Sequence, residues 1–200
     1  MKNWILVFLS FFLILACQEK WTFTEVSSYE NGQFSVLKGA PDVGSDYSVL
    51  YGFYENGVLK DITEYDGDKI SGLDVDYYED GGLRKIQEYT DGQPDGWSKV
   101  YYQSGELLQE SHWDQGLQLD NRNYYPNGNL GQEDEFKYGR KTYATYYLPN
   151  GVKYLEGAYR YERRIGVWSY YDSLGKLIKT EDLGDPVGDR LKKAREQKQQ

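Results

Sequence analysis

Residues 77–102 read Tyr-Tyr-Glu-Asp-Gly-Gly-Leu-Arg-Lys-Ile-Gln-Glu-Tyr-Thr-Asp-Gly-Gln-Pro-Asp-Gly-Trp-Ser-Lys-Val-Tyr-Tyr, which is one complete repeat and the start of the next. Glycines equivalent to Gly81 recur along the chain at intervals of 23 to 25 residues. A fixed period of this size is typical of an array of supersecondary units. The equivalent glycines are Gly32, Gly57, Gly105, Gly128, Gly151 and Gly175.

Each unit carries the pattern of two short strands and two turns. An aromatic pair precedes the glycine and a second glycine-containing turn follows it, as at Gly92. Aromatic runs that end in Asn-Gly or Asp-Gly favour a strand followed by a turn, because glycine accepts positive φ without steric cost. The aromatic pairs are Phe53-Tyr54, Tyr77-Tyr78, Tyr101-Tyr102, Tyr124-Tyr125 and, shifted by one residue, Tyr146-Tyr147 and Tyr170-Tyr171.

A single hairpin of this size cannot bury its apolar face, so neighbouring units must cover one another. We therefore predict an all-β fold of about six to seven 23–24-residue β-hairpin units in one elongated, mostly antiparallel, twisted sheet, with a ladder of Tyr, Leu and Trp as its core. The regular array spans 47–183. Residues 17–46 hold a lipidated N-terminus, a degenerate first repeat and a loop at 37–46. A longer basic loop is expected near 159–164, and a polar tail with helical potential at 184–200.

Composition fits a thin sheet with partly exposed rings. Aromatic residues make up 16% of the chain, with 21 Tyr, while the hydrophobic fraction is 39%. The formal net charge is −9, and this argues against nucleic acid as a partner because phosphate binding requires a basic face.

The N-terminus has the pattern of an export signal. Lys2 precedes an apolar run over 4–15 that is too short to span a bilayer. The following Ile14-Leu15-Ala16-Cys17 resembles the bacterial lipobox, although Leu15 is an unusual choice. The resemblance implies removal of residues 1–16, acylation of Cys17, for example with palmitate, and anchoring in the bacterial cell envelope. Gln18, not Asp, follows the cysteine, and by resemblance to the best-known lipoprotein sorting rule this implies the outer membrane. The alternative is a plain signal peptide or a short anchor with an incidental cysteine.

The sequence offers little for catalysis, and we expect no catalytic residue, no metal and no cofactor. His112 is the only histidine and alternates with Trp113 on an expected strand. A carboxylate pair would serve glycoside hydrolysis, and a carboxylate cluster would bind calcium. Acidic residues also suit turns and solvated strand edges, which we favour here. The carboxylates considered are Asp74, Asp76, Glu79, Asp80, Asp91 and Asp95.

Rows of aromatic residues suggest a face that stacks against a peptide or a carbohydrate. Most of these rings must belong to the core of the repeat. We take one row as the candidate binding face, namely Tyr54, Tyr78, Tyr102 and Tyr125.

The pattern Tyr-Tyr-x-x-Gly-x-Leu followed by Tyr-x-x-Gly, together with Gly96-Trp97 and Gly166-Val-Trp168, resembles the bacterial variant of the MORN repeat. Such chains are often labelled YwqK-family antitoxins. The resemblance covers about 47–183 and implies a non-enzymatic interaction scaffold. We expect an envelope-anchored lipoprotein that binds a protein or a glycan. The alternatives are an immunity or antitoxin protein that neutralises a toxin, and a glycan-acting enzyme with two converging carboxylates.

Overall fold

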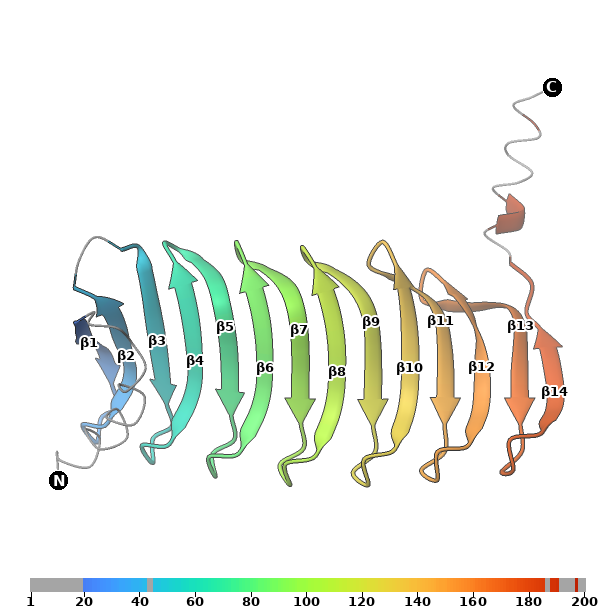
Figure 1. Ribbon diagram of the computed structural model, residues 1–200, viewed down its shortest axis with the longest axis horizontal. Coiled ribbons are helices and arrows are strands. Elements are labelled where there is room, and N and C mark those ends of the chain that lie inside the picture. Colours follow the sequence, from blue (N-terminus) through green and yellow to red (C-terminus); the bar gives the residue numbers. More distant parts are fainter. Residues whose placement is uncertain (1–19, 43–44, 186–187, 191–196, 198–200) are drawn as a thin grey trace.

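The computed structural model describes residues 20–42, 45–185, 188–190 and 197. Within these ranges the chain forms one open antiparallel sheet in which each strand pairs with its neighbours in sequence (Figure 1). The strands are β1 (Trp21–Ser28), β2 (Phe34–Pro41), β3 (Tyr47–Phe53), β4 (Leu59–Asp66), β5 (Lys69–Tyr77), β6 (Leu83–Thr90), β7 (Gln93–Tyr101), β8 (Leu107–Asp114), β9 (Leu117–Tyr124), β10 (Leu130–Lys137), β11 (Arg140–Tyr147), β12 (Lys153–Arg160), β13 (Arg163–Tyr171) and β14 (Leu177–Asp182).

The predicted all-β hairpin array is confirmed, and the described residues form a sheet of 14 strands. A short helical turn at 188–190 follows it, with the Asp185 side chain accepting a hydrogen bond from the Gly188 amide at 2.9 Å. The described part of the chain contains no helix long and apolar enough to cross a membrane.

Two predictions of loops were wrong. The loop expected at 37–46 is strand over 37–41, because β2 continues to Pro41. Gly39 is buried there, and a Cβ on it would lie 2.9 Å from the Phe23 ring, so the glycine serves packing rather than a turn. The longer basic loop expected near 159–164 is instead a two-residue turn, Tyr161-Glu162, between β12 and β13.

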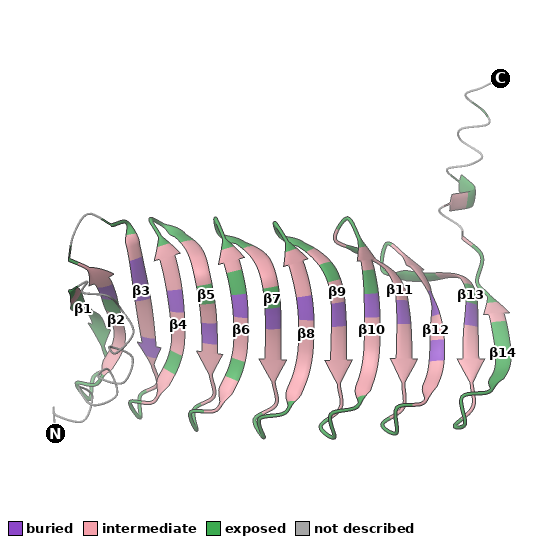
Figure 2. Ribbon diagram, viewed as in Figure 1, coloured by how far each residue is buried: buried purple, intermediate pink, exposed green. Residues whose placement is uncertain are grey.

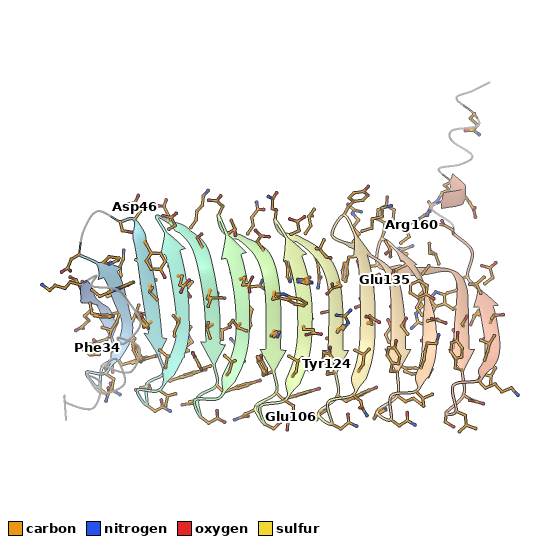
Figure 3. The ribbon with its side chains drawn as sticks, in the orientation of Figure 1. Phe34, Asp46, Glu106, Tyr124, Glu135 and Arg160 are labelled. Atoms are coloured by element: carbon orange, nitrogen blue, oxygen red, sulfur yellow. The ribbon has the colours of Figure 1, made fainter. Side chains whose placement is uncertain are left out.

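The turns at the two ends of the strands form two rows, one on each long side of the sheet. We call these rows the long-turn edge and the short-turn edge. The long-turn edge holds the repeat glycines. In the turn between β3 and β4, for example, the Tyr54 amide donates a hydrogen bond to the Val58 carbonyl at 2.8 Å. Gly57 has a φ of 83°, a conformation that glycine adopts without steric cost, so glycine is favoured at this position of the turn. The short-turn edge holds five two-residue turns, at 67–68, 91–92, 115–116, 138–139 and 161–162. In Figure 3, Glu106 lies at the long-turn edge and Arg160 near the short-turn edge.

A buried band crosses the middle of the sheet (Figure 2). Its residues are mostly small or polar, unlike the Tyr, Leu and Trp ladder that we expected. Large rings flank the band and lean over it; the Trp113 indole, for example, donates to the Ser111 hydroxyl at 2.9 Å. Register places these residues opposite one another on one face: Thr63, Asp74, Gln87, Ser98, Ser111, Asn121, Asp134 and Ala144.

The central row of the other face changes character along the chain. It is apolar at Ile62, Val75 and Ile86 and charged from β7 to β10. Register then places Lys99, Glu110, Arg122 and Glu133 side by side in alternating sign. The Arg122 Nε lies 2.9 Å from a Glu133 oxygen. Opposite charges directly across a strand pair stabilise it, so this half of the face is held by charge instead of apolar contact.

Two tryptophans that look equivalent in the repeat lie on opposite faces. Trp168 continues the buried row through Ala144, is 0% exposed, and lies over Gly157. Trp97 precedes Ser98 of that row by one residue and is 40% exposed. A shift of one residue moves a side chain to the other face of a strand. The spacings Gly96-Trp97 and Gly166-Val-Trp168 therefore specify different environments.

This difference predicts unequal effects of removing each indole. Trp168→Ala should lower the free energy of unfolding by about 3–5 kcal/mol, the usual cost for a buried Trp. Trp97→Ala should cost about 1 kcal/mol, the centre of the range for point substitutions. Urea unfolding followed by circular dichroism measures both variants, and equal losses would contradict the assigned faces.

Candidate binding surface

The predicted tyrosine row lies at the long-turn edge and joins successive units. The Tyr54 hydroxyl donates to the Tyr77 carbonyl at 2.8 Å, and the Tyr78 hydroxyl donates to the Tyr101 carbonyl at 2.7 Å. Each of these rings is half-buried. The same bond recurs from Tyr29 to Phe53, from Tyr102 to Tyr124 and from Tyr125 to Tyr147, at 2.8, 2.8 and 2.9 Å.

This tyrosine ladder always points from one unit to the next. It ends at Tyr125, because Leu148 and Asp172 occupy the equivalent positions in the last two turns. The hydroxyls of the row are therefore committed to the backbone, and a ligand would meet ring faces alone. Ligand binding by this row stays a prediction.

The ladder predicts a measurable contribution from each hydroxyl. Tyr78→Phe and Tyr102→Phe should each lower the free energy of unfolding by about 0.5–1.5 kcal/mol, the net value of one hydrogen bond. Tyr138 is 80% exposed at a turn of the other edge. Tyr138→Phe should therefore stay within about 0.5 kcal/mol of the parent chain. Denaturant titration measures the free energy of unfolding of the three variants. Losses in Tyr78→Phe and Tyr102→Phe no larger than that in Tyr138→Phe would show that the hydroxyl hydrogen bonds do not stabilise the array.

Cys17 lies outside the described residues. His112 stacks against Trp97 on the face opposite to the buried row of Ser98 and Ser111, with ring centroids 3.2 Å apart, and its Nδ1 lies 3.5 Å from an Asp120 oxygen. Sequence reasoning did not anticipate this cluster, because the pairing of His112 with Asp120 depends on register.

The predicted carboxylates are spread over the sheet. Asp74 accepts from Thr63 at 3.0 Å and pairs with Lys85 at 3.4 Å, while Asp76 pairs with Arg84 at 2.9 Å. Asp80 lies at the long-turn edge, and Asp91 lies at the short-turn edge. Within the described ranges, no three His, Cys, Asp or Glu side chains converge as a metal site would require.

The most distinctive surface is at the short-turn edge, over the turns 138–139 and 161–162. An open groove of about 700 Å³ lies there, lined by residues of β10 to β13 and by Gly188. Tyr138 and Tyr161 stand at the two turn tips and are 80% and 54% exposed. We call this surface the basic edge, and its cations are Lys137, Arg140, Lys141, Arg160, Arg163 and Arg164.

Cation–ring contacts hold the basic edge together. The Arg140 guanidinium lies 5.1 Å from the Tyr161 ring, so the two turns touch, and Lys137 lies 5.5 Å from the Tyr138 ring. Such contacts contribute about 0.5–1 kcal/mol at exposed sites. Arg160 pairs with Asp185, which joins the chain after β14 to this edge.

The buried band fixes the base of this surface. Lys141 Nζ lies 3.4 Å from Asp134 Oδ2, and Asp134 is 3% exposed. The Tyr159 ring packs edge-on against Trp168 at 5.3 Å, and its hydroxyl lies 2.8 Å from that of Tyr146. Burial and this hydroxyl contact raise the pKa of Tyr146. The aromatic cluster therefore gives the basic edge a rigid support.

The turn at the tip of β12 and β13 is conformationally costly. Tyr161 and Glu162 have φ of 50° and 59°, so two residues with side chains occupy the left-handed region. This region costs an L-residue other than glycine about 1–2 kcal/mol. The other two-residue turns carry a glycine, such as Gly139. A strained pair at a surface tip is a feature that functional sites tend to retain.

Charge on the short-turn edge is divided between its two halves. The first three turns carry aspartates, with Lys69 as a cation that pairs with Asp91 at 3.3 Å. The last two turns carry the basic edge. Within the described part of the chain, Lys137, Arg140 and Arg163 form no ion pair. We call the first half the acidic edge, made of Asp66, Asp68, Asp91, Asp95 and Asp114.

Sequence reasoning found the basic character near 159–164 but missed the surface. Lys137, Arg140 and Lys141 lie about one repeat earlier in the chain, and pairing of β11 with β12 brings them beside Arg160 and Arg163. A signal was present in the recurrence of Lys-Tyr-Gly-Arg at 137–140 and Arg-Tyr-Glu-Arg at 160–163, one period apart.

Comparison with known families gives one match. The MORN repeat variant family matches residues 94–115, which cover β7, the following long turn and β8. A search of curated proteins finds no significant match. The hairpin array and this repeat together fit a binding scaffold.

Proposed function

We propose that this chain is a bacterial envelope lipoprotein that acts as a non-catalytic binding scaffold and holds an acidic protein partner on its basic edge. The observation that carries the proposal is the local reversal of charge on a chain whose formal net charge is −9. Cations and exposed tyrosines gather at two adjacent turn tips there, over a rigid aromatic support.

The chemistry of the basic edge favours a protein surface with carboxylates. Arginine binds carboxylates through two parallel hydrogen bonds, and exposed tyrosine supplies apolar contact at low entropic cost. Arg140 and Arg163 are exposed and flank the Tyr161 tip, so both types of contact are available at one place.

The proposed anchor rests on the N-terminal sequence. Lys2, the apolar run over 4–15 and Cys17 in the lipobox position support export and acylation. Several acyl chains give stable attachment, whereas one chain gives marginal attachment.

Replacement of the acylated residue tests the anchor. Full-length chain expressed in a bacterium should be found in the membrane fraction and should carry a mass increase on Cys17. The Cys17→Ser chain should lack the added mass. Inhibitors of lipoprotein processing should block removal of residues 1–16 from the parent chain and should have no effect on the Cys17→Ser chain. An unmodified Cys17 in the membrane-bound chain would sink the lipoprotein assignment and leave the binding role untouched.

Charge reversal tests the basic edge. Arg140→Glu/Arg163→Glu should weaken binding of a fluorescent oligoglutamate peptide by about tenfold or more, since close charge pairs set affinity and register. Anisotropy titration at low protein concentration and moderate salt measures this affinity.

The matched control is Lys60→Glu/Arg84→Glu, which makes the same change of formal charge on β4 and β6. Lys60 and Arg84 side chains are 55% and 47% exposed. The control should change affinity by less than about twofold, because charges beyond a Debye length are screened. Equal losses in both double variants would show binding by overall charge and contradict a docking site at the basic edge.

A further inference from the structure

The two halves of the short-turn edge are complementary in charge and regular in spacing. The turns 67–68, 91–92, 115–116, 138–139 and 161–162 follow one another at steps of two strands. The middle turn, Gln115-Gly116, follows Asp114, the last aspartate of the acidic edge, and precedes the basic edge. The turns at equal distance from it therefore carry opposite charge, with 91–92 matching 138–139 and 67–68 matching 161–162.

This pattern selects one way of placing two copies edge to edge. A two-fold axis perpendicular to the sheet at the middle turn reverses the order of turns in the second copy. Asp91 then faces the turn flanked by Lys137 and Arg140. Asp68 faces the turn flanked by Arg160 and Arg163, where the two arginines outnumber the Glu162 carboxylate at the tip. The opposite arrangement, with turns in the same order, places like charges together and costs several kcal/mol.

The middle turn suits contact with itself. Leu117 and Leu119, which follow it on β9, are each 46% exposed. Near the axis a residue meets its own copy, as in any isologous interface, so uncharged groups are the favourable choice there. Gln115 and Gly116 at the tip are uncharged and Leu117 adds apolar surface, whereas Asp114, which precedes the tip, brings the carboxylates of the two copies near the axis and weakens the contact there.

The expected association is weak and sensitive to salt. Five turns at steps of two strands cover about 38 Å, given a strand spacing of about 4.8 Å. A contact of that length and about 10 Å width buries about 400 Å² on each copy, half of a standard interface. Electrostatic steering speeds such encounters but gives moderate affinity.

We propose that the short-turn edge forms a two-fold symmetric homodimer in which the basic edge of each copy binds the acidic edge of the other. The inference rests on the proposed function, because it assigns the occupant of the same basic edge. The dimer joins the turns 67–68 and 91–92 of one copy to 161–162 and 138–139 of the second copy, with Gln115 next to the axis.

Cysteine cross-linking tests the arrangement. The full-length chain, purified in detergent, carries Cys17→Ser so that an introduced cysteine is its single thiol. Gln115→Cys should form disulfide-linked dimers by itself. A mixture of Asp68→Cys and Glu162→Cys chains should form mixed dimers, whereas each chain alone should form few. Asn127→Cys, at the long-turn edge, controls for two chains that share a micelle.

Charge exchange tests the cause. Arg140→Asp/Arg163→Asp should lower the cross-linked fraction of Gln115→Cys chains by about tenfold, as high salt should. Addition of Asp68→Arg/Asp91→Arg in the same chain should restore it, because each copy then again presents complementary halves. Cross-linking of Gln115→Cys chains no greater than that of Asn127→Cys chains would overturn the dimer. So would a doubly exchanged chain that fails to recover the cross-linked fraction.

The oligoglutamate titration separates the two proposals. Peptide binding that requires Arg140 and Arg163 in a chain that fails to cross-link would retain the basic edge as a docking site and exclude a second copy as its occupant. Failure of both experiments would remove the dimer and the proposed function together. Cross-linking with rescue supports both.

Discussion

In the described part of the chain the sheet is a single layer with no second layer to cover it, and the rest of the structure depends on this. In most domains a sheet buries one face against helices or another sheet. Here each residue is covered only by the side chains of the adjacent strands and by its neighbours along its own strand on the same face. The positions that become buried are therefore those in the middle of the strand, where large rings from both directions meet. A small residue such as Ser111 lies beside a ring, that of Trp113, and a large residue fits where glycine faces it, as Trp168 does over Gly157.

The period of the sequence was sufficient to predict the hairpin array, because the repeat glycines and aromatic pairs mark turns and strands locally. The composition of the buried band was not predictable in the same way. A residue such as Asn121 or Asp134 reads as polar and exposed in its own strand, but it is buried beside polar side chains of neighbouring strands, with Gln109 hydrogen-bonded to Asn121 and Lys141 paired with Asp134. Gly39 and Pro41 read as loop residues for the same reason, since their packing partners lie on β1 and β3.

The candidate binding surfaces were harder to predict than the fold. The tyrosine row was recognised, but the hydrogen bonds from Tyr54 and Tyr78 to the next unit depend on how tightly the turns stack. The basic edge joins residues of two units, so its charge becomes visible once β11 lies beside β12. The two edges of the sheet thus differ in what their side chains do. The long-turn edge uses its polar groups to join units, and the short-turn edge leaves most of its charges facing solvent.

The single-layer arrangement also determines how the molecule bears load. Strand hydrogen bonds run along the long axis of the sheet, from β1 at one end to β14 at the other (Figure 1). Tension between the two ends therefore loads these bonds one strand pair at a time, as in opening a zip. Shear, by contrast, would load all the bonds of a strand together. A pull along this axis should lengthen the chain in discrete steps of one hairpin at low force, with the remaining units still folded, so the array would behave as an extensible tether.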